Sequence, residues 1–164
     1  MKAIVAVNKN WSIGKNGQLL YSIPGDMRFF RETTKGSTVI MGRKTLDSFP
    51  GGKPLKNRTN IVISSTPDER EGVVWASSPK DALLKTEDLN SAFLIGGATI
   101  YSQLIDYCTE AYVTIIDDYD MGDSFFPNLN KMNNWELYES SENFVENGYS
   151  YRFCKFKNNN PKEL

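Results

Sequence analysis

Short β-rich apolar runs that alternate with helical patterns constrain the fold of this chain more than any other feature of its sequence. The runs predict strands at Ala3–Val7, Thr38–Met41, Asn60–Ser64, Val73–Trp75 and Ala92–Ile95. Helical patterns lie between or after them, at Gly25–Thr34, Arg43–Ser48, Pro79–Lys85 and Ala98–Leu104. Ser78 is placed to cap the third helix, with Pro79 at its first position. This alternation is typical of an α/β domain with a mainly parallel sheet.

The last third of the chain has longer strands of a different pattern. Ala111–Ile116, Trp135–Ser140 and Tyr149–Phe156 alternate apolar and polar residues, which predicts antiparallel strands that close one edge of the sheet. The 164 residues are enough for one domain with its own core. We therefore expect a single domain over residues 1–157, with helices flanking the central sheet, and a frayed polar tail at residues 158–164.

The segment Asn8–Ile23 interrupts this rhythm. It holds glycines and polar residues without a clean period, which predicts a long loop directly after the first strand. Trp11, Ile13 and Leu19 make it too apolar for disorder. We prefer to interpret it as a mobile lid over a site, and an ordered surface loop is the alternative.

The composition excludes several kinds of chemistry. The chain has no histidine, which removes histidine bases, histidine zinc ligands and the Ser-His-Asp triad. Cys108 and Cys154 stand apart without a CxxC motif, so free thiols in a reducing cytosol are the simplest interpretation. A net charge of −1 gives no indication of nucleic-acid binding, and no apolar segment is long enough to span a membrane. We expect a soluble cytoplasmic protein.

Charge is divided unevenly along the chain. Residues 1–60 hold eleven Lys and Arg against three acids, whereas residues 61–164 hold eight against seventeen. Folding can intermix the two halves and cancel the difference. The alternative is that the first sixty residues hold the site for an anionic small ligand.

Three strand ends carry groups that suit a phosphorylated ligand. Gly96-Gly97 follows a predicted strand and opens a helix, where free backbone N–H groups favour an anion, although the GxGxxG fingerprint is absent. Gly42-Arg43-Lys44-Thr45 repeats this arrangement, and cations at a helix N-terminus oppose the helix dipole unless an anion joins them. Ser64-Ser65 adds two hydroxyl groups. Parallel strand ends meet at one edge of the sheet, so a nucleotide with several phosphates is one interpretation and ordinary surface chemistry the other.

Asp26 is the only acid in residues 1–31. In a first helical turn, an aspartate is usually a capping or dipole residue. Met27, Phe29 and Phe30 surround it, however, so its helix should face the interior at the end of the suspected lid. A carboxylate in an apolar pocket is suited to an amidine-like or guanidine-like edge, and without histidine it is also the natural candidate for acid–base work.

These motifs together resemble dihydrofolate reductase of the bacterial, chromosomal type. The resemblance covers residue 3 to about residue 156, and the motifs in family order are Ile13-Gly14, Ile23-Pro24-Gly25-Asp26, Val39-Ile40-Met41-Gly42-Arg43-Lys44-Thr45, Ile95-Gly96-Gly97, Asp123-Ser124-Phe125-Phe126-Pro127 and Trp135-Glu136. Each motif is modest, but the ordered set is very specific. The resemblance implies reduction of 7,8-dihydrofolate to tetrahydrofolate with a hydride from NADPH, an activity that supplies one-carbon and thymidylate metabolism and is a target of antifolate inhibitors.

The resemblance also implies roles for particular residues. Asp26 would hold the 2-amino group and N3 of the pteridine and polarise it, while water admitted by the lid delivers the proton to N5. Thr114 would hydrogen-bond this carboxylate, and Arg58 would pair with the α-carboxylate of the glutamate tail. Phe30, Phe49 and Leu55 would line the pocket of the p-aminobenzoyl ring. The other implied substrate-binding residues are Val5, Met27 and Ile95.

On the cofactor side, the resemblance implies three groups of contacts. Arg43, Lys44 and Thr45 would meet the phosphates of NADPH, and Ser64 and Ser65 would lie near the adenosine 2′-phosphate. Along the pyrophosphate would lie Gly96, Gly97, Ala98 and Thr99. The remaining implied cofactor-binding residues are Ala6, Ile13, Gly14, Gly42 and Tyr101. The resemblance implies no metal.

The chain departs from the family pattern at two places. Leu20-Tyr21 stands in the lid where the family usually has Pro-Trp, so we expect both residues to keep their catalytic place while the lid kinetics differ. Phe49–Leu55 is slightly longer than in many bacterial members. Two other functions stay open from the residues alone: the related NADPH-dependent pyrimidine reductase of riboflavin biosynthesis, and a catalytically silent nucleotide-binding module. No interface pattern is evident, so we expect a monomer.

Overall fold

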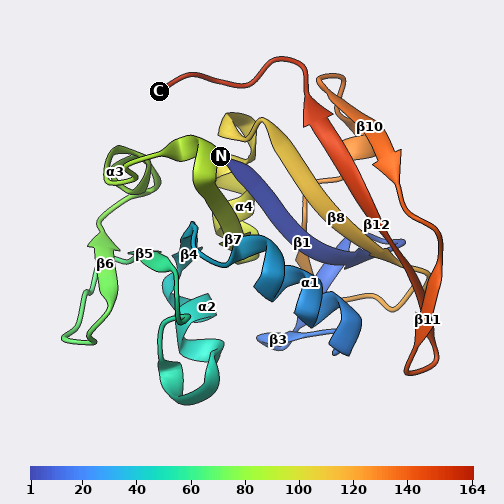
Figure 1. The fold of residues 1–164 in the computed structure, drawn as a ribbon, viewed down its shortest axis with the longest axis horizontal. Coiled ribbons are helices and arrows are strands. Elements are labelled where there is room, and N and C mark those ends of the chain that lie inside the picture. The colour runs from blue at the N-terminus through green and yellow to red at the C-terminus, as the bar shows by residue number, and fades with distance from the viewer.

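The computed structural model describes all residues, 1–164, and is built around one large sheet (Figure 1). Its strand order is β10-β12-β8-β1-β7-β4-β5-β6, with β11 paired to β12. The strands are β1 (Lys2–Asn8), β4 (Thr38–Gly42), β5 (Thr59–Ile63), β6 (Val73–Ala76), β7 (Ala92–Gly96), β8 (Glu110–Ile116), β10 (Trp135–Ser140), β11 (Phe144–Glu146) and β12 (Tyr149–Asn158). All pairings from β8 across to β6 are parallel. The predicted α/β class with a mainly parallel sheet is therefore confirmed.

The antiparallel part of the sheet is confined to the C-terminal edge. β12 pairs antiparallel with β8, and β10 and β11 pair antiparallel with β12. Ala111–Ile116, which lies in β8, was predicted to belong to this antiparallel group. That prediction holds for the pairing of β8 with β12 but was wrong for its pairing with β1, which is parallel along seven positions. Alternating sequence alone does not show the direction of a strand whose partners are distant in the chain.

Helices cover both faces of the sheet, as expected. Ala3, Val5 and Val7 of β1 point to a core of 24 buried residues that also receives α3 (Pro79–Leu84) and α4 (Ala98–Leu104). Ile4 points to the other face, where a smaller core lies under α1 (Pro24–Thr34) and α2 (Arg43–Ser48). The predicted cap of α3 is present, since Ser78 Oγ accepts from the backbone N–H of Asp81 at 3.0 Å.

Residues 8–23 contain regular structure that the sequence pattern did not indicate. β2 (Ser12–Lys15) and β3 (Gln18–Leu19) form a hairpin, and β9 (Ser124–Phe125) pairs with β2. The hairpin turns at Asn16-Gly17, both with positive φ, and this dipeptide favours a tight hairpin turn. Trp11 and Ile13 are buried in the main core. The segment is thus anchored at its start, whereas Leu19 at its tip is 81% exposed.

The C-terminal tail is bound to the domain, and the expectation of a frayed tail was wrong for residues up to Lys162. Asn158 ends β12 and is buried, and its side-chain amide donates to Cys108 O at 2.9 Å. Lys162 N donates to Asp106 O at 2.8 Å. Polar composition suggested fraying, but backbone hydrogen bonds to the turn before β8 keep this segment in place. No helix in the structure has the length and apolar character needed to cross a membrane.

Candidate active site

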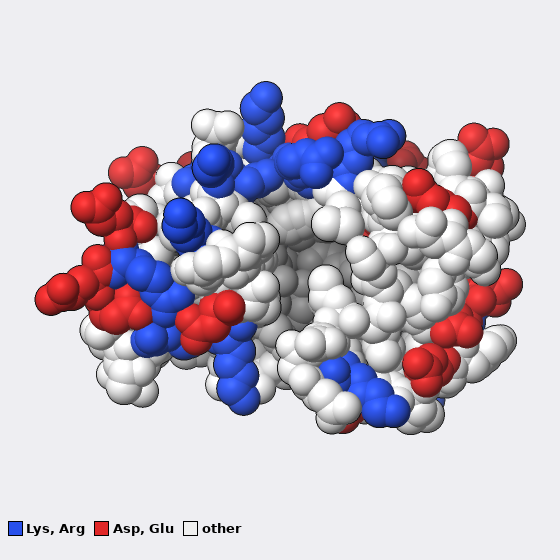
Figure 2. All heavy atoms as spheres, turned by 90° about the horizontal axis from the view of Figure 1, so that it is seen from below, with Lys and Arg blue, Asp and Glu red and all other residues white.

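Figure 2 shows a hollow in the face of the molecule that is turned downward in Figure 1. Lys and Arg side chains gather at parts of its margin, whereas most of the visible interior carries neither basic nor acidic groups. This is the face on which α1 and α2 lie in Figure 1. A hollow without charged groups in its interior and with charged groups at its margin is suited to a small-molecule site.

Asp26 is joined to the sheet and does not cap its helix. The N-cap residue of α1, Ile23, makes no side-chain cap bond, and Asp26 Oδ1 accepts from Thr114 Oγ1 on β8 at 2.6 Å. The hydrogen bond that the resemblance implied is therefore present. Thr114 is only 2% exposed, so the bond is shielded from water. Burial raises the pKa of Asp26, and the bond from Thr114 opposes this rise.

Apolar residues from three parts of the chain gather beside α1. They are half-buried and pack on the smaller core that contains Ile4, Val39 and Phe93; the members predicted to line the substrate pocket are Phe30, Phe49, Leu55 and Ile95. Met27 does not join them, because it is 55% exposed and accepts a contact from Ser22 Oγ at 3.7 Å. Met27 therefore lies at the surface and outside this core, and its contact with substrate stays a prediction. Val5 and Ala6 pack against the two other cores.

Arg58 is held by the end of α1 and is no solvated turn residue. Its Nε donates to Thr34 Oγ1 at 2.9 Å, one Nη to Arg31 O at 3.2 Å and the other to Lys56 O at 3.0 Å. Thr34 is fully buried. Burial and the nearby charge of Arg31 lower the pKa of Arg58, although the guanidinium keeps its charge at any ordinary pH. The structure thus presents a cation in a fixed position.

Tyr21 ties the end of the 8–23 segment to the turn after β8. Its hydroxyl donates to Asp118 Oδ2 and accepts from Asn8 Nδ2 at 3.1 Å, and its ring packs edge-on against Tyr149 at 5.0 Å. Burial and Asp118 raise the pKa of Tyr21 to about 12. Leu20 beside it is half-buried, and its N–H donates to Ile13 O at 3.4 Å. Tyr21 thus tethers two segments at a position where the chain departs from the pattern it resembles.

Two of the glycines predicted to approach phosphates lie at helix starts, and the first of them is tightly packed. Gly42 and Gly97 are the N-cap residues of α2 and α4. A Cβ on Gly42 would lie 3.0 Å from Ile100, and one on Gly97 would lie 3.6 Å from Thr45 Oγ1, so the two helix starts are neighbours. Gly96 has a φ of +126°, a conformation that favours glycine. The hydroxyl of Tyr101 donates to Ile4 O at 2.7 Å.

The other predicted cofactor residues differ in their accessibility. Lys44, Ser65 and Thr99 are exposed, whereas Gly42, Ser64, Gly97 and Ala98 are half-buried. Ile13 is buried in the main core, and Gly14 lies in the small sheet, where a Cβ would approach Gln18 O to 2.8 Å. Ser65 borders a shallow cavity of about 260 Å³, together with Trp75 and Lys85.

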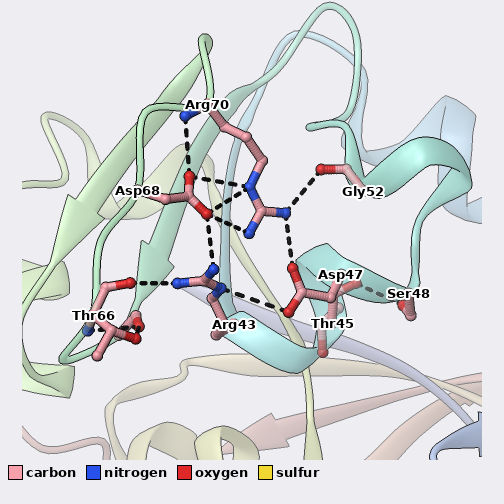
Figure 3. Close-up of polar contacts among 9 residues, drawn as sticks. Arg43, Thr45, Asp47, Ser48, Gly52, Thr66, Asp68 and Arg70 are labelled. Atoms are coloured by element: carbon pink, nitrogen blue, oxygen red, sulfur yellow. Dashed lines mark hydrogen bonds and ion pairs between the residues drawn. The ribbon is translucent and has the colours of Figure 1, made fainter.

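Arg43 already has protein partners, so two carboxylates of the fold itself supply the anions that a cation at this helix start requires. Its guanidinium lies 2.8 Å from Asp68 Oδ2 and 3.5 Å from Asp47 Oδ2. Arg70 contacts the same two carboxylates, Asp68 at 2.7 Å and Asp47 at 2.8 Å (Figure 3). We call these four side chains the charge ring. No pattern in the sequence pointed to Asp68 and Arg70, because they lie 25 residues or more beyond Arg43.

Comparison with known proteins decides between the open functions. The family model described as dihydrofolate reductase matches residues 1–158. The chain belongs to the dihydrofolate reductase family. Neither the riboflavin-pathway reductase nor the silent binding module is favoured by this match.

Relatives agree with this assignment over nearly the whole chain. The chain is 38% identical to dihydrofolate reductase of Bacillus subtilis over 160 residues, covering 96% of this chain and 94% of the relative. It is 42% identical to that of Haemophilus influenzae over 136 residues, covering 83% and 81%. A structure of Enterococcus faecalis dihydrofolate reductase, complexed with NADP(H) and RAB-propyl, matches with a TM-score of 0.85 and 33% identity, covering 96% of this chain and 95% of that one.

Proposed function

We infer that this chain catalyses the NADPH-dependent reduction of 7,8-dihydrofolate to 5,6,7,8-tetrahydrofolate by direct hydride transfer. The observation that carries the site assignment is the shielded hydrogen bond between Asp26 and Thr114, which places one carboxylate beside an apolar pocket. The match to the dihydrofolate reductase family supports the reaction.

The residues at the starts of α2 and α4 fit a dinucleotide. Gly42 and Gly97 are the N-cap residues of α2 and α4, and the backbone N–H groups of a helix start favour a phosphate. The phosphates of the dinucleotide would be held by Gly42, Thr45, Gly97 and Ala98. Its adenosine end would be held by Ser64 and Ser65. NADPH, when bound, supplies the hydride.

Asp26 acts by binding and polarising the pterin. Its carboxylate has the geometry to accept two N–H groups from the 2-amino and N3 edge, which orients the ring and favours positive character on it. Thr114 keeps one carboxylate oxygen in a fixed direction. Phe30, Phe49 and Leu55 exclude water from the p-aminobenzoyl ring of the substrate. Arg58 pairs with the α-carboxylate of its glutamate tail. The proton for N5 comes from water that the 8–23 segment admits or excludes.

The test is the loss of NADPH absorbance on adding dihydrofolate, for the parent and for Asp26→Asn. Rapid oxidation by the parent and near loss in the variant are expected. Glu32→Gln is the matched control, because it removes the same charge from an exposed position on the same helix. Equal activity in parent and Asp26→Asn would keep the enzyme but remove Asp26 from the mechanism. No activity in the parent would refute the proposed reaction.

We propose further that the chain works as a monomer in the cytoplasm and binds antifolate inhibitors at the pterin pocket. Cys108 and Cys154 support a reducing compartment, since both are free and buried. Light scattering should give a mass near 18.6 kDa. A mass twice this value would refute the monomer.

A further inference from the structure

The charge ring is a closed and internally balanced cluster. Each of its two guanidinium groups contacts each of its two carboxylates, so positive and negative charges alternate around it (Figure 3). Both guanidinium groups also lie near the Trp75 ring, Arg43 at 5.3 Å and Arg70 at 5.8 Å from its centroid. Arg43 therefore has a defined position, but its charge is largely neutralised within the fold.

Asp68 accepts hydrogen bonds from both arginines of the charge ring. One of its oxygens accepts from Arg43 and from both Nε and Nη2 of Arg70, and the other accepts from the backbone N–H and Nε of Arg70. Hydrogen bonds from Arg70 hold the pKa of Asp68 down at about 2, so this group is anionic at any physiological pH. Arg70 is in turn anchored by Gly52 O at 3.0 Å.

The ring adjoins the serines that would receive the 2′-phosphate. Arg43 donates to the backbone carbonyl of Thr66, whose own N–H donates to Ser64 Oγ at 3.0 Å. An anion bound at Ser64 would therefore be linked to the Arg43 guanidinium through the backbone of a single residue, Thr66. It would share that guanidinium with the Asp68 carboxylate.

We propose that Asp68 is a specificity-determining residue for the cofactor, because its carboxylate competes with the 2′-phosphate of NADPH for Arg43 and so limits the preference for NADPH over NADH. This inference rests on the proposed function of the site. NADH carries a neutral hydroxyl where NADPH carries the phosphate, so repulsion from Asp68 acts on one cofactor only. Arg70 has the opposite effect, since its positive charge offsets the negative charge that Asp68 presents to Arg43.

Two variants with opposite expected effects on phosphate affinity distinguish competition for Arg43 from simple structural support of Arg43. Asp68→Asn keeps the shape of the side chain and an oxygen that can accept from Arg70, but it removes the negative charge. Arg70→Gln leaves the full charge of Asp68 on Arg43. A ring that served only to hold Arg43 in place would lose phosphate affinity in both variants, whereas competition predicts a gain in the first and a loss in the second.

The experiment measures the affinity of 2′,5′-ADP relative to 5′-AMP, and of NADPH relative to NADH, by calorimetry. Asp68→Asn should raise both ratios about three- to tenfold, as expected for a unit charge across one guanidinium in screened solvent. Arg70→Gln should lower them by a similar factor. Glu69→Gln is the matched control, because it removes the same charge from the neighbouring exposed position without touching Arg43, and it should leave both ratios unchanged. Urea unfolding confirms that each variant is folded at the temperature of the titration.

An unchanged or lowered ratio in Asp68→Asn would overturn the inference, as would a parent protein that binds neither fragment. The nucleotide fragments separate this result from the proposed function, because they carry no nicotinamide and need no dihydrofolate. A parent that selects 2′,5′-ADP and responds to Asp68→Asn but does not reduce dihydrofolate would refute the reaction and keep the inference. Steady-state kinetics give a further check, since competition for binding lowers KM for NADPH in Asp68→Asn.

Discussion

Replacing Thr114 by valine isolates the hydrogen bond on which the Asp26 site depends. The substitution keeps the shape of the side chain and removes one hydroxyl, which donates to Asp26 Oδ1 at 2.6 Å from a position that is 2% exposed. No cavity is created. Asp26 keeps the burial that raises its pKa and loses the donor that lowers it, so the pKa of Asp26 rises further in the variant.

The size of the effect follows from the charge of the acceptor. A hydrogen bond to a charged group contributes about 1.5–3 kcal/mol, so the free energy of unfolding at neutral pH should fall by about that amount. The bond favours the ionised carboxylate, and its contribution is therefore present above the pKa of Asp26. It is lost as the pH falls through that pKa. The difference between parent and variant should shrink in acid.

Urea unfolding of the parent, Thr114→Val, Asp26→Asn and the double variant measures this directly. In the Asp26→Asn background the bond is neutral, and Thr114→Val should cost only about 0.5–1.5 kcal/mol. If the dihydrofolate reaction uses this carboxylate, kcat/KM in Thr114→Val should fall about tenfold to a hundredfold. An equal cost in both backgrounds, or a cost that does not change with pH, would refute this account of Asp26.

Three further predictions concern other parts of the fold. Tyr21→Phe removes the hydroxyl bond to the Asp118 carboxylate and should lower the free energy of unfolding at neutral pH by about 1.5 kcal/mol, a difference that should shrink as the pH rises from the ordinary tyrosine pKa toward the raised Tyr21 pKa of about 12, as chemical denaturation will show. Gly96→Ala places a Cβ 3.3 Å from the Tyr101 ring at a φ of +126° and should cost about 1–3 kcal/mol, read from thermal melting; an unchanged melting temperature would contradict it. Burial raises the pKa of the Cys108 thiol to about 12, so this group should react with a thiol reagent only after unfolding, and rapid labelling of the native protein would be the opposite result.

Much of the fold was predictable because its information is local. The strands Thr38–Gly42, Trp135–Ser140 and Ala92–Gly96 lie where apolar runs between turn residues place them, to within a residue or two. The hairpin at Asn16-Gly17 also has a local signature in that dipeptide, although residues 8–23 as a whole have no clean period. β9 has only two residues and β11 three, too few for a pattern to show.

The candidate site was predictable in its parts and less so in its connections. Asp26, the glycine pairs and the serines stand out by residue type and by their place at strand and helix ends. The bond from Asp26 to Thr114 spans 88 positions, and only the family resemblance indicated it. Nothing in the sequence pointed to the bonds that Asp68 and Arg70 make around Arg43, or to the bond between Tyr21 and Asp118.

Hydrophobic periodicity, caps and turn residues act over a few positions, so the elements, the class of the fold and the residue types at the strand ends follow from local sequence. The direction of β8, the attachment of the tail through Asn158 and the neutralisation of Arg43 arise only in the folded molecule. Each of these depends on which distant backbone or charged group lies within about 3 Å, and that is set when the whole sheet has closed around its core.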